Sequence, residues 1–124
     1  MKEVMAVLRI NMIGKTKKAL EDAGISSFMA KNCLGRGVGL IDYKALKGAE
    51  LGYDEAIEQL GAGQRLISKR FISVVVPDDL VETTVKTIIA ANQTGNPGDG
   101  KVFVLPIMNS IRIRTGEEGP ATLD

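Results

Sequence analysis

Histidine and tryptophan are absent from this chain of 124 residues, cysteine occurs once, and only 4% of the residues are aromatic. Without histidine there is no Ser-His-Asp or Cys-His catalysis, and the commonest zinc ligand is missing. The single cysteine, Cys33, excludes a disulfide within the chain. Scarce aromatic side chains argue against a stacking platform for single-stranded nucleic acid. The composition therefore excludes histidine-based catalysis and a zinc site built on histidine.

Long apolar runs and an excess of one charge are also absent. No apolar segment reaches the length of a membrane span, and the N-terminus, where charged and apolar residues alternate, has no hydrophobic region typical of a signal peptide. The net charge of +1 creates no field that would attract nucleic acid or a membrane surface. We expect a cytoplasmic protein with no nucleic-acid partner and no insertion into a membrane.

The length predicts a single domain over residues 1–124. Apolar residues make up 44% of the chain and charged residues 25%, which is typical of a globular domain. A chain this short buries only about two-thirds of the surface of its unfolded state. Association of several copies would therefore stabilise it.

Both halves of the chain follow the order strand, helix, strand. The apolar periodicity predicts strands at 4–10, 27–33, 71–76 and 102–105, and helices at 12–23 and 81–92. This order, repeated twice, indicates an α+β fold, the ferredoxin-like βαββαβ sandwich. A doubly wound sheet shows a similar alternation, but the chain is short for it.

Polar residues and glycine indicate where the two helices begin and end. Asn11 is placed to cap the first helix, and Gly24 is placed to end it. Asp79 and Glu82 have the spacing of a capping box at the start of the second helix.

Residues 94–117 carry the clearest chemical signal. A glycine-rich loop delivers Lys101 to an apolar strand, and a second short strand at 111–114 carries Arg112 and Arg114 on one face. Glycines let backbone N–H groups approach a ligand and form anion-binding nests. Together with the cations, such a loop suits a phosphate-rich small molecule. No Gly-Lys-Ser/Thr follows the glycines, so the loop is not a Walker motif, and each feature alone also fits an ordinary loop or a solvated strand face.

A segment of 32 residues, 35–66, separates the two halves and is rich in glycine. Loops this long in a compact domain are usually functional or disordered. A tolerated insertion and a protruding recognition loop both fit. In the second case Leu46, Leu51 and Tyr53 are the expected apolar anchors for a target protein.

Several of these motifs resemble those of the PII signal-transduction proteins. The run Gln93-Thr94-Gly95, the run Gly98-Asp99-Gly100-Lys101 and the run Ile111-Arg112-Ile113-Arg114-Thr115-Gly116-Glu117 resemble the two C-terminal motifs of that family, in family order. Residues 69–79 and 48–50 are also similar. The resemblance implies a ferredoxin-like subunit, a trimer, and a nucleotide at each cleft between subunits. Segment 35–66 would be the T-loop, which docks onto target proteins.

The resemblance also implies site residues. The ligand would be ATP or ADP, with Mg²⁺ accompanying ATP. Arg112 and Arg114 would come from the adjoining subunit. The full set of implied nucleotide-binding residues is Gly35, Gly37, Val75, Gly98, Asp99, Gly100, Lys101, Arg112 and Arg114. Lys69 matches the lysine that meets 2-oxoglutarate.

The chain departs from the family pattern in its T-loop. Gly39 stands where the family has a glutamine that helps to hold Mg²⁺ and 2-oxoglutarate, and Leu51 stands at the position of the modified tyrosine. Val38 replaces an arginine, and Met29 replaces a threonine near adenine. These changes predict weak binding of 2-oxoglutarate, or binding only when a partner subunit is present. They also argue against nucleotidylylation at the family's tyrosine position.

The loop is about ten residues longer than usual, and its entry reads Gly35-Arg36-Gly37. These features are most similar to the nitrogenase-linked branch, whose members act with a paralogous subunit to inhibit nitrogenase. The leading hypothesis is thus a nucleotide sensor that is not an enzyme and has no catalytic residues and no metal site. It would be homotrimeric or mixed with a paralogue, and it would act on a nitrogenase component. The alternatives are a regulator of an ammonium transporter, a slow ATPase, and a trimer that senses a metal or an anion without nucleotide.

Overall fold

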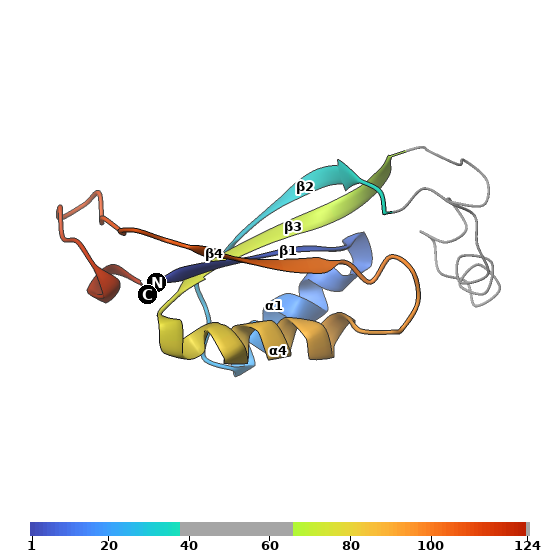
Figure 1. Ribbon diagram of the computed structural model, residues 1–124, viewed down its shortest axis with the longest axis horizontal. Coiled ribbons are helices and arrows are strands. Elements are labelled where there is room, and N and C mark those ends of the chain that lie inside the picture. The colour runs from blue at the N-terminus through green and yellow to red at the C-terminus, as the bar shows by residue number, and fades with distance from the viewer. Residues whose placement is uncertain (38–65, 124) are drawn as a thin grey trace.

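The computed structural model describes residues 1–37 and 66–123, which form a four-stranded sheet with two helices on one face (Figure 1). The strands are β1 (Lys2–Arg9), β2 (Met29–Gly35), β3 (Ile67–Val76) and β4 (Lys101–Pro106), and the helices are α1 (Ile13–Asp22) and α4 (Val81–Asn92). Short 3₁₀ helices lie at η1 (Ile10–Met12), η2 (Asp78–Leu80) and η3 (Pro120–Thr122).

The strand order is β2-β3-β1-β4, and every neighbouring pair is antiparallel. This is the ferredoxin-like arrangement that the sequence predicts. A doubly wound sheet would have parallel neighbours, so the structure excludes that alternative.

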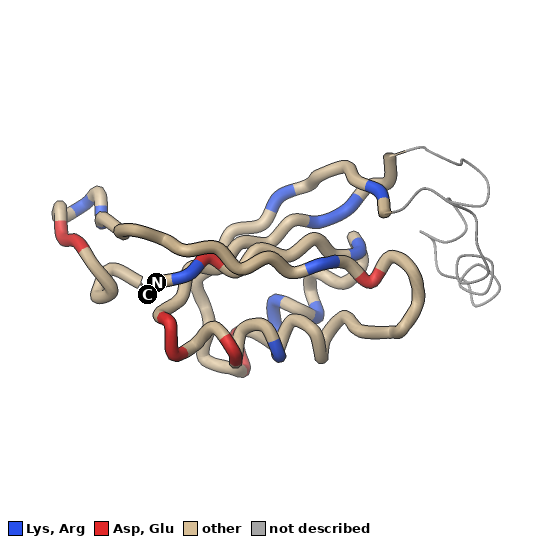
Figure 2. Tube along the Cα trace, viewed as in Figure 1, with Lys and Arg blue, Asp and Glu red and all other residues tan. Residues whose placement is uncertain are grey.

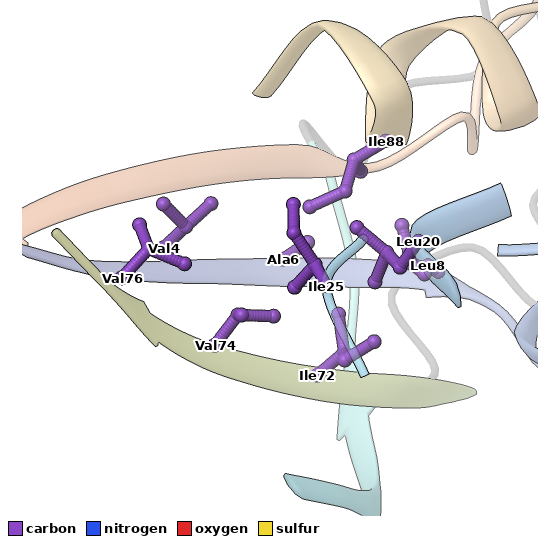
Figure 3. Close-up of a cluster of buried hydrophobic side chains, with 9 residues drawn as sticks. All are labelled: Val4, Ala6, Leu8, Leu20, Ile25, Ile72, Val74, Val76 and Ile88. Carbon is purple, nitrogen blue, oxygen red and sulfur yellow. The ribbon is translucent and has the colours of Figure 1, made fainter. Parts of the chain in front are cut away.

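The core lies between the sheet and the helices. Alternate residues of β1 and β3 point toward the helices, where they meet Leu20 of α1 and Ile88 of α4 (Figure 3). The buried cluster consists of Val4, Ala6, Leu8, Leu20, Ile25, Ile72, Val74, Val76 and Ile88. The opposite face of the sheet, which we call the open face, has no helix over it in the described part of the chain (Figure 1).

The helix ends confirm one capping prediction and contradict two. Gly24 has φ +85°, its N–H bonds to the carbonyl of Glu21, and the N–H of Ile25 bonds to that of Leu20, which together end α1. Asn11 is not the N-cap of α1, because it lies within η1. The start of α4 has no side-chain cap either, because residues 78–80 form η2 before the helix begins.

The predicted strand at 111–114 is not formed. Ile111 makes a single bridge to Glu118, and the chain turns at residues 113–115. The N–H of Gly116, which has φ +76°, bonds to the carbonyl of Arg112 at 2.7 Å. The two arginines therefore belong to a turn and do not share a strand face.

Candidate functional site

The glycine-rich loop between α4 and β4, residues 93–100, is organised around the carboxylate of Asp99. Oδ2 accepts hydrogen bonds from the backbone N–H groups of Thr94 and Gly95, both at 2.8 Å. Oδ1 accepts a hydrogen bond from the hydroxyl of Thr94. The side chain of Asp99 therefore faces its own loop, and this residue would contribute backbone to an anion site.

Arg9, at the end of β1, binds this loop through its guanidinium group. Its guanidinium donates to Asp99 Oδ1 at 2.7 Å and to the carbonyl of Pro97 at 2.9 Å, and the residue is only 5% exposed. Sequence reasoning missed Arg9. The one available signal was a charged residue at the end of a strongly apolar strand, where burial requires a partner.

These contacts lower the pKa of Asp99. Burial of the carboxyl group raises the pKa, but the hydrogen bonds from Thr94, from the Arg9 guanidinium and from the backbone of Gly95 stabilise the charged form more strongly. The net shift is downward. Asp99 is therefore ionised at neutral pH.

Gly100 brings the loop against β1. It has φ +110°, and a Cβ atom added there would lie 1.9 Å from the carbonyl oxygen of Val7. Only glycine allows this approach. Lys101 then begins β4 directly opposite Val7 in the register of the sheet.

Lys69, on β3, lies beside the same loop. It pairs with Arg9 in the register of β1 and β3, is 7% exposed, and its Nζ lies 3.4 Å from the carbonyl oxygen of Gly98. Two buried cations thus lie under the glycine loop, and the lysine predicted to meet 2-oxoglutarate contacts the loop backbone.

A cavity of about 510 Å³ opens on the helix side of the loop, between α4 and β4. Its walls are mainly apolar, with Asn92, Gln93 and Lys101 as polar members. Asp99 and Gly100 also line it. The loop therefore forms part of the wall of this cavity.

The structure divides the predicted nucleotide-binding residues into two groups. The glycine loop and Lys101 lie at one end of the sheet, where β2 also ends at Gly35 (Figure 1). Gly37 is exposed just beyond.

The second group lies toward the other end. Val75 pairs with Glu3 near the start of β1. Arg112 and Arg114 belong to the segment that follows the far end of β4, where Figure 2 shows basic residues in blue. Arg112 makes an ion pair with Glu117 at 3.1 Å, whereas Arg114 is exposed. One chain therefore does not bring the two arginines to Lys101.

Several predicted positions lie outside the described residues. These are the docking anchors Leu46, Leu51 and Tyr53, and the T-loop departures Val38 and Gly39. Within residues 1–37 and 66–123, no three His, Cys, Asp or Glu side chains are grouped so that they could hold a metal ion. In the same residues, no helix is both long and apolar enough to cross a membrane.

Comparison with known proteins decides the family. The family model described as nitrogen regulatory protein P-II matches residues 1–117. The chain belongs to the PII family. This PII chain is 40% identical over 124 residues to the nitrogen fixation nifHD region GlnB-like protein 2 of Methanobacterium ivanovii, and the match covers 96% of each chain.

Two other similar proteins are more distant. The nitrogen regulatory protein P-II 1 of Escherichia coli is 36% identical, with 99% of this PII chain and all of that protein covered. The crystal structure of Arabidopsis thaliana PII bound to citrate superimposes with a TM-score of 0.71 at 29% identity, over 97% of this chain and 86% of that one. The family and fold expected from the sequence are thereby confirmed.

Proposed function

We propose that this PII chain is a nitrogen-regulatory sensor that binds ATP or ADP at the glycine loop and acts on a target protein through its T-loop. The observation that supports nucleotide binding best is the loop itself. Gly98 and Gly100 both have positive φ, the loop is held by Arg9, and it leads directly to Lys101. Backbone N–H groups in such turns, with a lysine beside them, suit phosphate groups.

Magnesium enters this proposal only with ATP. The carboxylate of Asp99 is bonded to Thr94, Gly95 and Arg9, so its oxygens are already engaged. Mg²⁺ keeps several waters and is commonly held by substrate phosphates with few protein ligands. The phosphates of ATP, rather than Asp99, would hold the ion here.

A homotrimer, or a trimer mixed with a paralogue, would complete the site. The two groups of predicted nucleotide-binding residues lie toward opposite ends of one sheet, so a neighbouring copy must supply Arg112 and Arg114 to Lys101. The open face also carries apolar side chains that a neighbour would cover, with Phe103 46% exposed and Leu105 36% exposed. The apolar members of this face on β1, β3 and β4 are Met5, Val7, Phe71, Val75, Phe103 and Leu105.

A nitrogenase component is the proposed target. The support is that similar proteins of Methanobacterium ivanovii and Methanosarcina barkeri are named nitrogen fixation nifHD or nifHD1 region GlnB-like proteins. Recovery of nitrogenase components with the tagged protein from extract of its own cells would support this target. Recovery of an ammonium transporter instead would redirect the proposal to that alternative.

Calorimetric titration with ATP and with ADP tests the nucleotide site. We expect Lys101→Ala to weaken binding by about 2 kcal/mol or more, because a charge-assisted contact to phosphate is lost. Lys86→Ala is the matched control, since Lys86 is an exposed lysine of α4 paired with Glu82 at 2.7 Å. Equal affinity of Lys101→Ala and the unaltered protein would refute the site.

The same titration tests 2-oxoglutarate, with Mg²⁺ and ATP present. We expect weak binding, because Gly39 offers no side-chain ligand and Lys69 Nζ contacts the carbonyl of Gly98. Tight, magnesium-dependent binding would show that another residue replaces the family glutamine.

A further inference from the structure

Arg9 is the residue of this site that no motif singles out. It ends β1, is 5% exposed, and uses two guanidinium nitrogens on two different parts of the loop, the carboxylate of Asp99 and the carbonyl of Pro97. A planar guanidinium can hold both acceptors at once in a fixed geometry. The loop is thereby attached to the end of β1.

The contact with Pro97 has a consequence for the direction of the loop N–H groups. In a planar trans peptide the C=O and the N–H point in opposite directions. The bond from Arg9 to the Pro97 carbonyl, at 2.9 Å, therefore turns the N–H of Gly98 away from the guanidinium. The contact of Lys69 with the Gly98 carbonyl, at 3.4 Å, turns the N–H of Asp99 away in the same manner.

The contact with Asp99 has an electrostatic consequence. An ionised carboxylate next to a phosphate site repels the phosphate, and the repulsion grows as the surroundings become less polar. Arg9, at 2.7 Å from Asp99 Oδ1, supplies the compensating charge from a buried position. The Asp99 carboxylate can therefore accept the hydrogen bonds that organise the loop without repelling an anion bound there.

We propose that Arg9 is a positioning residue of the glycine loop: it aims the Gly98 and Asp99 N–H groups at the ligand phosphates and neutralises Asp99, without touching the ligand. This inference rests on the proposed function, because it assigns the loop to phosphate. It adds a residue on β1 to a site whose predicted members lie elsewhere.

Hydrogen exchange in the absence of ligand tests the structural half. The N–H groups of Thr94 and Gly95 donate to Asp99, so their exchange reports the closed loop. In Arg9→Met we expect exchange at these two groups to be about tenfold faster or more, with β1 and β3 still protected. Lys17→Met, which removes an exposed lysine of α1, is the control and should change nothing. Unchanged exchange at Thr94 and Gly95 in Arg9→Met would overturn the inference.

Binding of ADP and of inorganic pyrophosphate tests the functional half. We expect the affinity of Arg9→Met for each ligand to be lower by about tenfold or more. Arg9→Lys should recover part of the affinity, because an ammonium keeps the charge but loses the fork that spans Asp99 and Pro97. If Arg9→Met fails to fold, Arg9→Lys is the variant to measure. Wild-type affinity in Arg9→Lys would overturn the claim that the guanidinium must span Asp99 and Pro97.

A double variant separates position from charge. In Arg9→Met with Asp99→Asn the charges balance again, but nothing holds the Pro97 carbonyl, so binding should stay weak. Recovery of full affinity would show that Arg9 acts by charge alone and would overturn the positioning role. If the unaltered protein binds neither nucleotide nor pyrophosphate, the proposed function fails, and the exchange of Thr94 and Gly95 still decides whether Arg9 shapes the loop.

Discussion

At the scale of single residues, the loop depends on Gly100 more than on Gly95. Gly95 and Gly100 both have positive φ, but a Cβ atom would meet open space at Gly95 and the Val7 carbonyl at Gly100. The shared backbone strain and the clash specific to Gly100 can therefore be measured separately.

We predict that Gly100→Ala destabilises the protein far more than Gly95→Ala. Alanine at either position incurs about 1–2 kcal/mol for the left-handed backbone. The additional displacement of β4 from Val7 should lower the free energy of unfolding of Gly100→Ala by about 2 kcal/mol more. Urea denaturation of both variants measures the difference, and equal losses would contradict the close contact.

The lowered pKa of Asp99 predicts a pH dependence of stability. A carboxyl group whose pKa is lower in the folded state stabilises the fold above its unfolded value of about 3.9, and this contribution disappears as the pH falls through the folded pKa. Asp99→Asn lacks the contribution. We expect the unaltered protein to exceed this variant in free energy of unfolding at neutral pH, and the difference to shrink below about pH 4.

In the comparison with Asp99→Asn, the contribution of a second acidic group to the pH dependence of stability cancels. The pKa of Asp78 is lowered as well, through its hydrogen bond and charge contact with the N-terminal ammonium, 2.9 Å away. Asp78 is present in both proteins, so its effect cancels. A difference in stability that stays constant down to pH 2 would contradict the assignment to Asp99.

At the scale of elements, β1 positions most of the site. Its end supplies Arg9 to Asp99, its Val7 carbonyl receives Gly100, and its register places Lys69 beside Arg9. β1 is also a central strand with neighbours on both sides. The glycine loop is therefore attached to a central strand, while segment 35–66 connects the edge strand β2 to β3.

This separation predicts that the T-loop can be shortened without loss of the nucleotide site. A variant with residues between Gly48 and Gly61 removed should fold and bind ADP normally, because the described core residues and the glycine loop at 93–100 come from other parts of the sequence. It should no longer inhibit the target. ADP titration together with a nitrogenase activity assay measures both, and full inhibition by the variant would place the docking surface on the body of the protein.

At the scale of the whole molecule, the open face and the separation of the predicted nucleotide-binding residues both support the proposed association. Phe103 and Leu105 are exposed apolar residues on the face opposite the helices, and the arginines lie at the far end of β4 from Lys101. A second copy over the open face would bury apolar area, which stabilises by about 25 cal/mol per Å².

We predict a trimer in sedimentation equilibrium that Phe103→Asp dissociates. Phe103 is 46% exposed on the open face, and a carboxylate buried there against a neighbour would be unpaired. Ile89→Asp is the matched control, since Ile89 is 43% exposed but belongs to α4 on the helix side. A monomer at micromolar concentration for the unaltered protein, or equal dissociation of both variants, would refute an interface on this face.

What the sequence by itself determined is local or periodic. Alternation of apolar residues located the four strands of the sheet and the two helices, Gly24 ended α1 as expected, and the motif from Gly98 to Lys101 indicated both the loop and the family. These features depend on neighbours along the chain, because helix and strand periodicity and glycine conformation act over a few residues. The same reasoning was wrong for 111–114, where alternating Arg and Ile imitated a strand although Gly116 allows a turn.

Only the tertiary structure decided how the site is held together. Arg9 reaches Asp99 across 90 positions of sequence, and Lys69 reaches Gly98 across 29. No local pattern records such contacts, because they depend on the register and order of β4, β1 and β3. For the same reason the sequence could place Lys101 and Arg112 in one short segment, whereas the rigid strand β4 between them keeps the two cations apart within one chain.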